Sequence, residues 1–282
     1  MLNQKMIYSI HTYMQNFSEK AMIKFQSFTS SSSGNCTFIT DDTTHILIDC
    51  GAPLRYIEKC LARLNIAPNE LCAIFLTHAH SDHVAAAGSL SKKYNLPIFA
   101  TDETFLLSGK YLSSVNRKCA KIISANEDII IGDMVVHSFS IPHDISGAVS
   151  YTVCDKETKF GIATDSGHIS DEILSNLTGC ESVIVEANHN VDMLLSGPYP
   201  YPLKKRILSD RGHLSNTLCG ELCVKLATSG TKSFWLGHLS EKNNTPETAY
   251  SEVLSILKEN GYTAGSDISL NVIPKNWIEE KI

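Results

Sequence analysis

Residues 77–83 read Thr-His-Ala-His-Ser-Asp-His, so three imidazoles and a carboxylate lie close together in the chain. These are ligand types that zinc, manganese and iron accept. Side chains two positions apart in an extended segment point the same way, so His78 and His80 can bind one ion together. Asp82 and His83 lie beyond the bend and can reach a second ion, at the spacing of roughly 3.5–4 Å that supports hydrolysis. This segment therefore predicts a two-metal centre.

Three more residues of ligand type stand where an expected strand ends. His143 follows the apolar stretch 135–141, Asp165 ends the stretch 159–165, and His238 ends SFWLGH. A rigid sheet commonly presents functional side chains at its strand ends. Each residue alone could instead have a capping role or lie at the edge of the core. Because all three stand at strand ends, we favour a metal site to which all three contribute.

The elements that must position these residues are strands with short turns, followed by helices. The continuous apolar run 72–76 predicts a strand buried on both faces. Two β-rich halves, each closed by helices, predict an α/β (α+β) sandwich of two sheets with helices outside. Strands are expected at 22–28, 36–40, 45–49, 72–76, 97–100, 128–131, 134–140, 149–154, 159–164, 182–186, 232–236 and 268–273. Helices are expected at 53–64, 83–94, 170–177, 200–208, 215–228 and 246–260.

These residues resemble the metallo-β-lactamase superfamily. The HxHxDH box matches at 78–83, and the later ligands match at His143, Asp165 and His238, within a resemblance that covers 22–274. It implies a four-layer αβ/βα sandwich with the metals at one edge. It also implies that His78, His80 and His143 hold one ion, that Asp82, His83 and His238 hold the other, and that Asp165 bridges them.

Two further segments favour cleavage of phosphodiesters. Glu186 lies in VIVEANH and His213 in RGHLSN, and they resemble the glutamate and histidine that ribonuclease Z pairs as proton donor to the leaving group. A histidine held protonated by a carboxylate can supply that proton. The alternative is that both residues only support or cap their neighbours. The candidate catalytic residues are Asp82, Glu186 and His213.

Two spacings exclude some relatives within this resemblance. The 22 residues from His143 to Asp165 leave no room for the tRNA-gripping arm of many ribonuclease Z enzymes. The 73 residues from Asp165 to His238 are too few for the β-CASP domain of RNase J-type nucleases. What remains resembles the YycJ (WalJ/VicX-like) group, through FTSSSSGN, LIDCG, THAHSDH, VEANHNVDML and GHLSN. That group implies an exonuclease, with DNA favoured over RNA. A small-molecule hydrolase, such as a thioesterase of the glyoxalase II kind, is the alternative.

Composition bounds the possible partners. The net charge of −6 does not favour binding of a polyanion to the protein surface as a whole, so nucleic acid would need a local basic patch. Such a patch could form from Lys204, Lys205, Arg206 and Arg211, although a solvated helix face is the competing interpretation. Two roles are open for the polar turn 31–35: it binds an anion through its backbone N–H groups, or it only connects the two strands of a hairpin.

The remaining expectations concern organisation and environment. Residues 1–21 lack the apolar core of a signal peptide, and no run approaches the roughly 20 apolar residues of a membrane span. We expect a cytoplasmic protein with a poorly ordered extension at 1–21 and one metallo-β-lactamase-fold domain at 22–282. Nine cysteines without a CxxC pair favour buried reduced thiols. Two divalent ions are expected, and the ligands suit zinc and manganese alike. We expect Asp49 to orient a ligand histidine.

Overall fold

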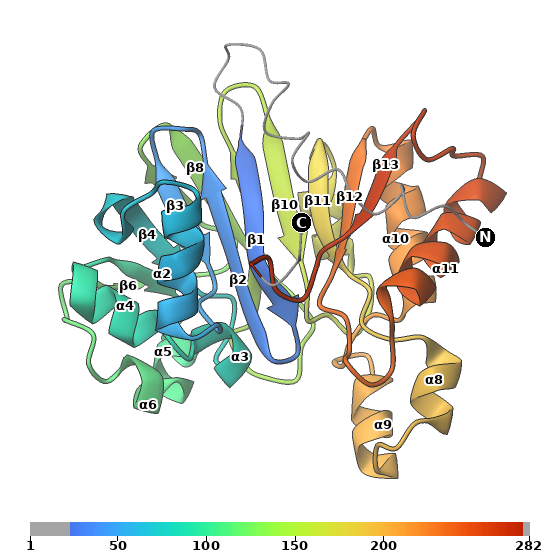
Figure 1. Cartoon of the computed structure of the whole chain (residues 1–282), viewed down its shortest axis with the longest axis horizontal. Helices are drawn as coiled ribbons and strands as arrows, with labels where there is room; N and C mark the ends of the chain where they lie inside the picture. Colours follow the sequence, from blue (N-terminus) through green and yellow to red (C-terminus); the bar gives the residue numbers. More distant parts are fainter. Residues whose placement is uncertain (1–22, 279–282) are drawn as a thin grey trace.

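Two β-sheets form the centre of the structure (Figure 1). The computed structural model describes residues 23–278. The strands of the first sheet, in spatial order, are β1 (Lys24–Ser31), β2 (Gly34–Thr40), β3 (His45–Ile48), β4 (Leu71–Phe75), β5 (Ile98–Ala100) and β6 (Ala120–Ile122). Those of the second are β7 (Asp128–Ile131), β8 (Met134–Ser140), β9 (Val149–Cys154), β10 (Lys159–Ala163), β11 (Ser182–Glu186), β12 (Ser233–Gly237) and β13 (Ser269–Val272), again in spatial order.

Each sheet has an antiparallel part and a parallel part. Strands β1 to β3 pair antiparallel, and β3 to β6 pair parallel. Strands β7 to β10 pair antiparallel, and β10 to β13 pair parallel. Because parallel strands end at the same edge of a sheet, the residues that follow β10, β11 and β12 are brought together. The same holds for the residues that follow β3 and β4.

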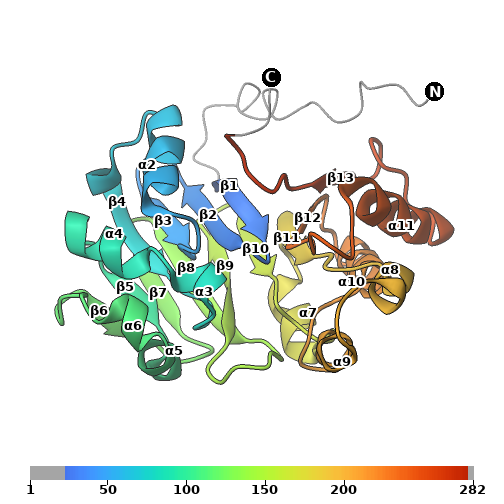
Figure 2. The same ribbon diagram turned by 60° about the horizontal axis from the view of Figure 1, so that its bottom comes forward.

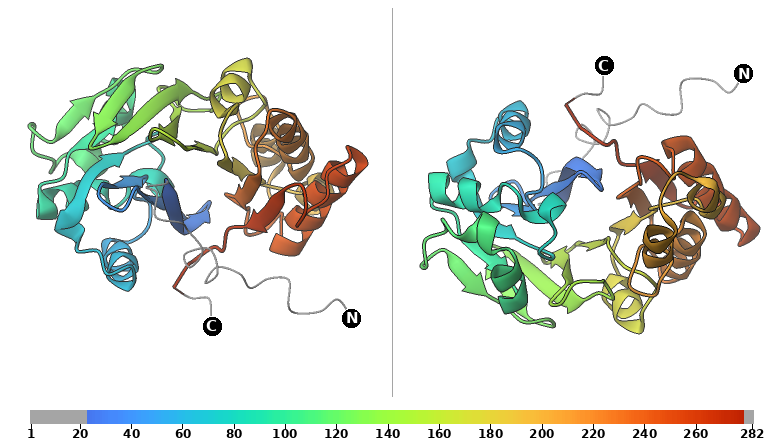
Figure 3. Two further views of the ribbon diagram at one scale, coloured as in Figure 1. Left: turned by 90° about the horizontal axis from the view of Figure 1, so that it is seen from above. Right: turned by 90° about the horizontal axis from the view of Figure 1, so that it is seen from below.

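Helices cover the outer face of each sheet, as Figures 1 and 3 show for α2 and α4 on one side and for α10 and α11 on the other. Within residues 23–278, no helix is long and apolar enough to cross a membrane. The helices between the strands of the first half are α2 (Leu54–Arg63), the 3₁₀ turn η2 (Pro68–Glu70), α3 (Ser81–Val84), α4 (Ala87–Tyr94), α5 (Asp102–Leu107) and α6 (Gly109–Leu112). Those of the second half are α7 (Asp171–Leu177), α8 (Val191–Ser196), α9 (Tyr201–Ile207), α10 (Asn216–Thr228) and α11 (Pro246–Glu259).

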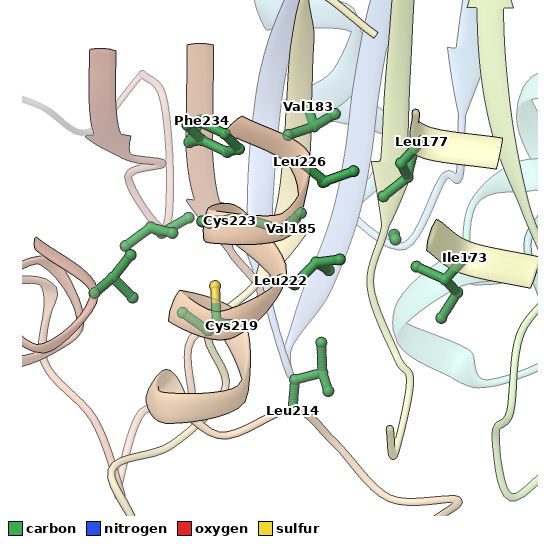
Figure 4. Close-up of a cluster of buried hydrophobic side chains, with 14 of the residues drawn as sticks. Ile173, Leu177, Val183, Val185, Leu214, Cys219, Leu222, Cys223, Leu226 and Phe234 are labelled. Carbon is green, nitrogen blue, oxygen red and sulfur yellow. The ribbon is translucent and has the colours of Figure 1, made fainter. Parts of the chain in front are cut away.

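Three apolar cores hold these layers together. The central core lies between the sheets and contains Ile46 and Phe75 from the first sheet and Tyr151 and Ile184 from the second. A second core joins the first sheet to α2 and α4. A third joins the second sheet to α7, α10 and α11, and Figure 4 shows part of it around Leu222. The expected four-layer αβ/βα sandwich is confirmed.

The termini of the main helices agree with their sequence signals. The side chains of Ser170, Ser215 and Thr245 accept hydrogen bonds from backbone N–H groups in the first turns of α7, α10 and α11. Hydroxyl side chains are favoured at this position because they satisfy N–H groups that have no partner inside the helix. Pro246 then opens α11, where its missing N–H costs nothing.

Several expectations need correction. The segment 83–94 is two helices rather than one, because the N–H of Ala86 donates to the carbonyl of Cys50 instead of continuing the helix. Strand β4 is buried except at Cys72, whose side chain is exposed at the start of the strand. Apart from half-buried Cys154, the other cysteines are buried free thiols, as expected. The short elements β6, α5, α6 and α8 were not expected from the sequence. The expected extension at 1–21 lies outside the described residues.

Candidate metal centre

The first group of converging nitrogens belongs to His78, His80 and His143. The loop after β4 carries the first two histidines, and the loop after β8 carries the third. Nδ1 of His80 lies 3.1 Å from Nε2 of His78 and 3.3 Å from Nε2 of His143. The side chains of His78 and His143 are fully buried, whereas His80 is 30% exposed. The structure thus brings together the three residues expected to share one ion.

The second group contains Asp82, His83 and His238. The short helix α3 presents the first two residues, and the chain leaving β12 presents the third. Oδ2 of Asp82 lies 3.4 Å from Nε2 of His83 and 3.8 Å from Nε2 of His238. These three residues can also hold an ion together.

Asp165 stands between the two groups. Its Oδ2 lies 3.5 Å from Nε2 of His83, and its Oδ1 lies 3.4 Å from Nε2 of His238. It also forms a possible ligand group with His78 and His83. One carboxylate therefore lies within reach of both sets, which is the position that a bridging ligand requires.

The centre fits divalent cations by the chemistry of its atoms. Across residues 23–278, Oδ2 of Asp165 and Nε2 of His238 are among the few buried side-chain atoms without a hydrogen-bond partner. Leaving a buried polar atom without a partner costs about 1–3 kcal/mol. A cation between these atoms would remove that cost, and the imidazole and carboxylate donors suit zinc or manganese.

Burial and neighbouring carboxylates shift the pKa values of these histidines in opposite directions. Burial lowers the pKa of His78 well below its usual value, which favours the neutral imidazole that a metal ligand must be. Burial alone would also lower the pKa of His83, but the carboxylates of Asp49, Asp165 and Asp82 raise it well above the usual value. A cation that binds His83 would therefore have to displace the proton that these carboxylates favour on its ring.

Asp49 supports the second group from behind. Its Oδ2 lies 2.7 Å from Nδ1 of His83, and its Oδ1 accepts a hydrogen bond of 2.9 Å from the N–H of Thr77. The hydroxyl of Thr77 donates to Oδ2 over 2.9 Å. A contact between Asp49 and one of these histidines is expected from the sequence, and because it engages Nδ1, the other ring nitrogen of His83 faces Asp82 and Asp165.

Glu186 connects the candidate proton donor to the last ligand. Its Oε1 lies 2.8 Å from Nδ1 of His213 and 2.7 Å from Nδ1 of His238. Its Oε2 accepts hydrogen bonds from the N–H groups of Ser166 and Leu214. Burial would raise the pKa of Glu186, but the two histidines lower it, so this carboxyl stays ionised. The two residues identified separately in the sequence thus form one hydrogen-bonded pair.

His213 keeps access to solvent beside this carboxylate. Its side chain is 20% exposed, and its Nδ1 lies 3.7 Å from Oδ1 of Asp165. Burial would lower its pKa, but Glu186 and then Asp165 raise it. The charged form of the imidazole is therefore favoured beside Glu186 and Asp165.

Sequence reasoning missed Asp144 and Asn35. Oδ1 of Asp144 lies 3.4 Å from Nε2 of His80, and its Oδ2 accepts a hydrogen bond from Nε of Arg206. Nδ2 of Asn35 lies 3.1 Å from Nε2 of His83. The only signals were the position of Asp144 next to His143 and the position of Asn35 in the polar segment 31–35, which the structure places at the start of β2.

The backbone bends where the strands deliver these side chains. Asp49, Asp165 and His238 have φ angles of 61°, 60° and 55°, in the left-handed region that L-residues seldom adopt. The N–H of His238 donates to Oγ of Ser30 over 2.8 Å, which fixes this bend against β1. Each of these residues follows the end of a strand, β3, β10 or β12. Figure 2, in which the bottom of Figure 1 comes forward, shows on that side the helix α3 that carries Asp82 and His83.

Comparison with known proteins agrees with this geometry. The sequence profile of the Metallo-beta-lactamase superfamily matches residues 31–238. The chain belongs to this superfamily. The matched region begins at the end of β1 and ends at His238, so it contains all seven expected ligand residues.

Two curated members are similar over most of their length. The chain is 33% identical to Exodeoxyribonuclease WalJ of Streptococcus pneumoniae over 249 residues, which cover 88% of this chain and 93% of that protein. It is 31% identical to Exodeoxyribonuclease YycJ of Bacillus anthracis, over 88% of this chain and 94% of that protein. Within the superfamily the chain therefore belongs to the WalJ/YycJ group of metallohydrolases.

The fold has close structural neighbours. The crystal structure of the metallo-beta-lactamase fold protein YhfI from Bacillus subtilis superposes with a TM-score of 0.70 at 16% identity. The match covers 90% of this chain and 98% of that chain. This likeness shows that the two proteins share the fold.

Proposed function

We propose that this chain is a metal-dependent exonuclease that acts on DNA. The observation that carries the proposal is the Glu186–His213 pair, which lies against the ligands His238 and Asp165. Hydrolysis of a phosphodiester requires a proton for the departing oxygen, and this pair would supply it from an imidazole whose charged form Glu186 favours. The similarity to two exodeoxyribonucleases supports DNA as the substrate.

The proposed ligand set assigns each ion to one group of side chains. When bound, two divalent ions supply an activated water and offset the negative charge of the phosphate. We assign one ion to His78, His80 and His143, the other to Asp82, His83 and His238, with Asp165 between them.

The proposed proton donor is Nε2 of His213. Nδ1 of this imidazole is engaged by the carboxylate of Glu186, which leaves Nε2 as the nitrogen that can give up its proton. Glu186 acts on His213 by fixing the orientation of the ring and stabilising its charged form. The buried N–H groups of Ser166 and Leu214 hold the carboxylate in place through its other oxygen.

Purified chain loaded with zinc or manganese tests this function on labelled single- and double-stranded DNA and RNA. Each substrate is supplied with free ends, with the 5′ end blocked and with the 3′ end blocked. We expect stepwise shortening of DNA from one end, which a block at that end prevents, and slower action on RNA. Rapid cleavage of S-lactoylglutathione without cleavage of either nucleic acid would show that the protein is a thioesterase and not a nuclease.

A further inference from the structure

Helices α8 and α9 form a hairpin that projects beyond the strands, at the lower right of Figure 1. Between them lies a groove of about 510 Å³, lined by Leu195 of α8 and by residues of α9 and the segment after it. Tyr201 and Lys205 of α9 and Leu208, which directly follows that helix, lie on one face because they are spaced four and three residues apart. Tyr201 is 78% exposed, and Leu195 and Leu208 are about half exposed. An aromatic ring and two leucine side chains are thus exposed to solvent in the same groove.

The groove also carries positive charge. Nζ of Lys204 donates to the carbonyl of Leu195 over 2.6 Å, which ties the two helices together. Neither Lys204 nor Lys205 forms an ion pair with any carboxylate of residues 23–278. Lys205 is exposed. The chain as a whole has a net charge of −6, so this local excess stands out against the average surface.

A continuous segment joins this groove to the metal centre. Arg206 follows Lys205 by one position and so lies about 100° around α9 from it; it bonds to Asp144 beside His80. The N–H of His213 donates to the carbonyl of Ile207 over 3.0 Å. Helix α9 therefore lines the groove with one face and contacts the surroundings of the metal centre with another.

We propose that the α8–α9 groove binds the single-stranded part of a nucleic acid whose end lies in the metal centre. This inference rests on the proposed nuclease function. The ring of Tyr201 stacks on a base, Leu195 and Leu208 flank that base, and Lys205 binds a phosphate. Proteins that hold single strands without reading their sequence combine an aromatic platform with a basic groove in this way.

The chemistry of the groove favours a nucleic acid over a protein partner. An apolar peptide would not use the unpaired ammonium group of Lys205. Aromatic ring, apolar flanks and positive charge together match the alternation of bases and phosphates. The helix that lines the groove also contacts, through Arg206, the surroundings of a centre proposed to cut phosphodiesters, which points the same way.

Four variants test the groove. Tyr201→Ala removes the ring and Lys205→Glu reverses the charge. Tyr201→Phe keeps the ring as a matched control. Lys121→Glu makes the same charge reversal on β6, at the opposite side of the molecule (Figure 1). None of these residues belongs to the metal centre, so folding and metal content should match the unaltered chain.

Two measurements separate the groove from the chemistry. Fluorescence anisotropy of a labelled single-stranded DNA reports binding, and hydrolysis of bis(p-nitrophenyl) phosphate reports the centre alone, because that ester is too short to reach the groove. We expect Tyr201→Ala to weaken DNA binding roughly tenfold, as loss of one stacked base does. Lys205→Glu should weaken binding and reduce its dependence on salt. Both variants should hydrolyse the small ester normally, and both controls should bind DNA normally.

The outcomes are distinguishable. Unaltered DNA binding by both Tyr201→Ala and Lys205→Glu would reject the groove while leaving the nuclease intact. A chain that cleaves neither DNA nor RNA would reject the nuclease, whatever the variants bind. A change of oligomeric state in Tyr201→Ala, seen by sedimentation, would assign the groove to a second copy of this chain and overturn the proposal.

Discussion

Replacing Asp49 by asparagine should weaken one of the two metal sites and leave the other almost unchanged. The carboxylate has one oxygen facing the N–H of Thr77 and the other facing Nδ1 of His83. Asparagine has a single acceptor oxygen and an amide that only donates. One of the two donors must therefore lose its acceptor, in a position that is 3% exposed.

The size of the effect follows from this loss. A buried donor left without an acceptor costs about 1–3 kcal/mol. If Nδ1 of His83 is the donor that loses its acceptor, the affinity for the ion that His83 contacts should drop roughly 10- to 100-fold. Mutating the hydrogen-bond partner of a ligand histidine typically lowers metal affinity by this factor. The ion at His78, His80 and His143 should keep its affinity, so metal binding should become biphasic.

Competition with a chromophoric chelator measures both affinities. Asp41→Asn is a matched control, because Asp41 is also 3% exposed and accepts hydrogen bonds from the N–H groups of Thr43 and Thr44. It lies in the β2–β3 turn, so its replacement should lower the melting temperature without changing metal affinity. Equal metal affinities in the two variants would refute the role assigned to Asp49.

Three further predictions concern the centre itself. His80→Ala and Asp165→Ala should abolish phosphodiester hydrolysis while circular dichroism shows the native fold, and normal turnover in either would reject the ligand set. His213→Ala should keep its metal, measured by elemental analysis, and lose roughly 10²–10⁴ in turnover; an unchanged rate would reject the proton-donor role. Asp144→Asn should release Arg206 and lower turnover about 10- to 100-fold, whereas wild-type kinetics would make the contact with His80 incidental.

The sequence marked the side chains that the structure brings together more clearly than it marked the residues around them. Six neighbouring positions carry four of the proposed ligands, and the others follow buried strands, so a short pattern marked each of them. The contact between Glu186 and His213 spans 27 positions and became visible through resemblance. Asp144 pairs with Arg206 across 62 positions and Asn35 contacts His83 across 48, and no local pattern reports such contacts.

The missed helices share a physical cause. Helices α5, α6 and α8 have six, four and six residues, too short for a periodic apolar face to appear. Leu106 and Leu107 at the end of α5 are exposed, which weakens the pattern further. The proposed ion assignments, the domain limits at 22–282 and the extension at 1–21 stay predictions.

The left-handed backbone of Asp49, Asp165 and His238 affects which substitutions are favoured at these positions during evolution. Each bend of this kind costs about 1 kcal/mol or more for a residue with a Cβ atom, against a total stability of roughly 5–15 kcal/mol. Glycine would adopt the same φ angles without that cost. At Asp49 that saving would be offset by the lost hydrogen bonds to Thr77 and His83, whereas Oδ2 of Asp165 has no hydrogen-bond partner within residues 23–278 to lose. A descendant that lost its activity would therefore gain stability most readily by a change to glycine at position 165, and glycine there would mark an inactive enzyme even where the HxHxDH box survives.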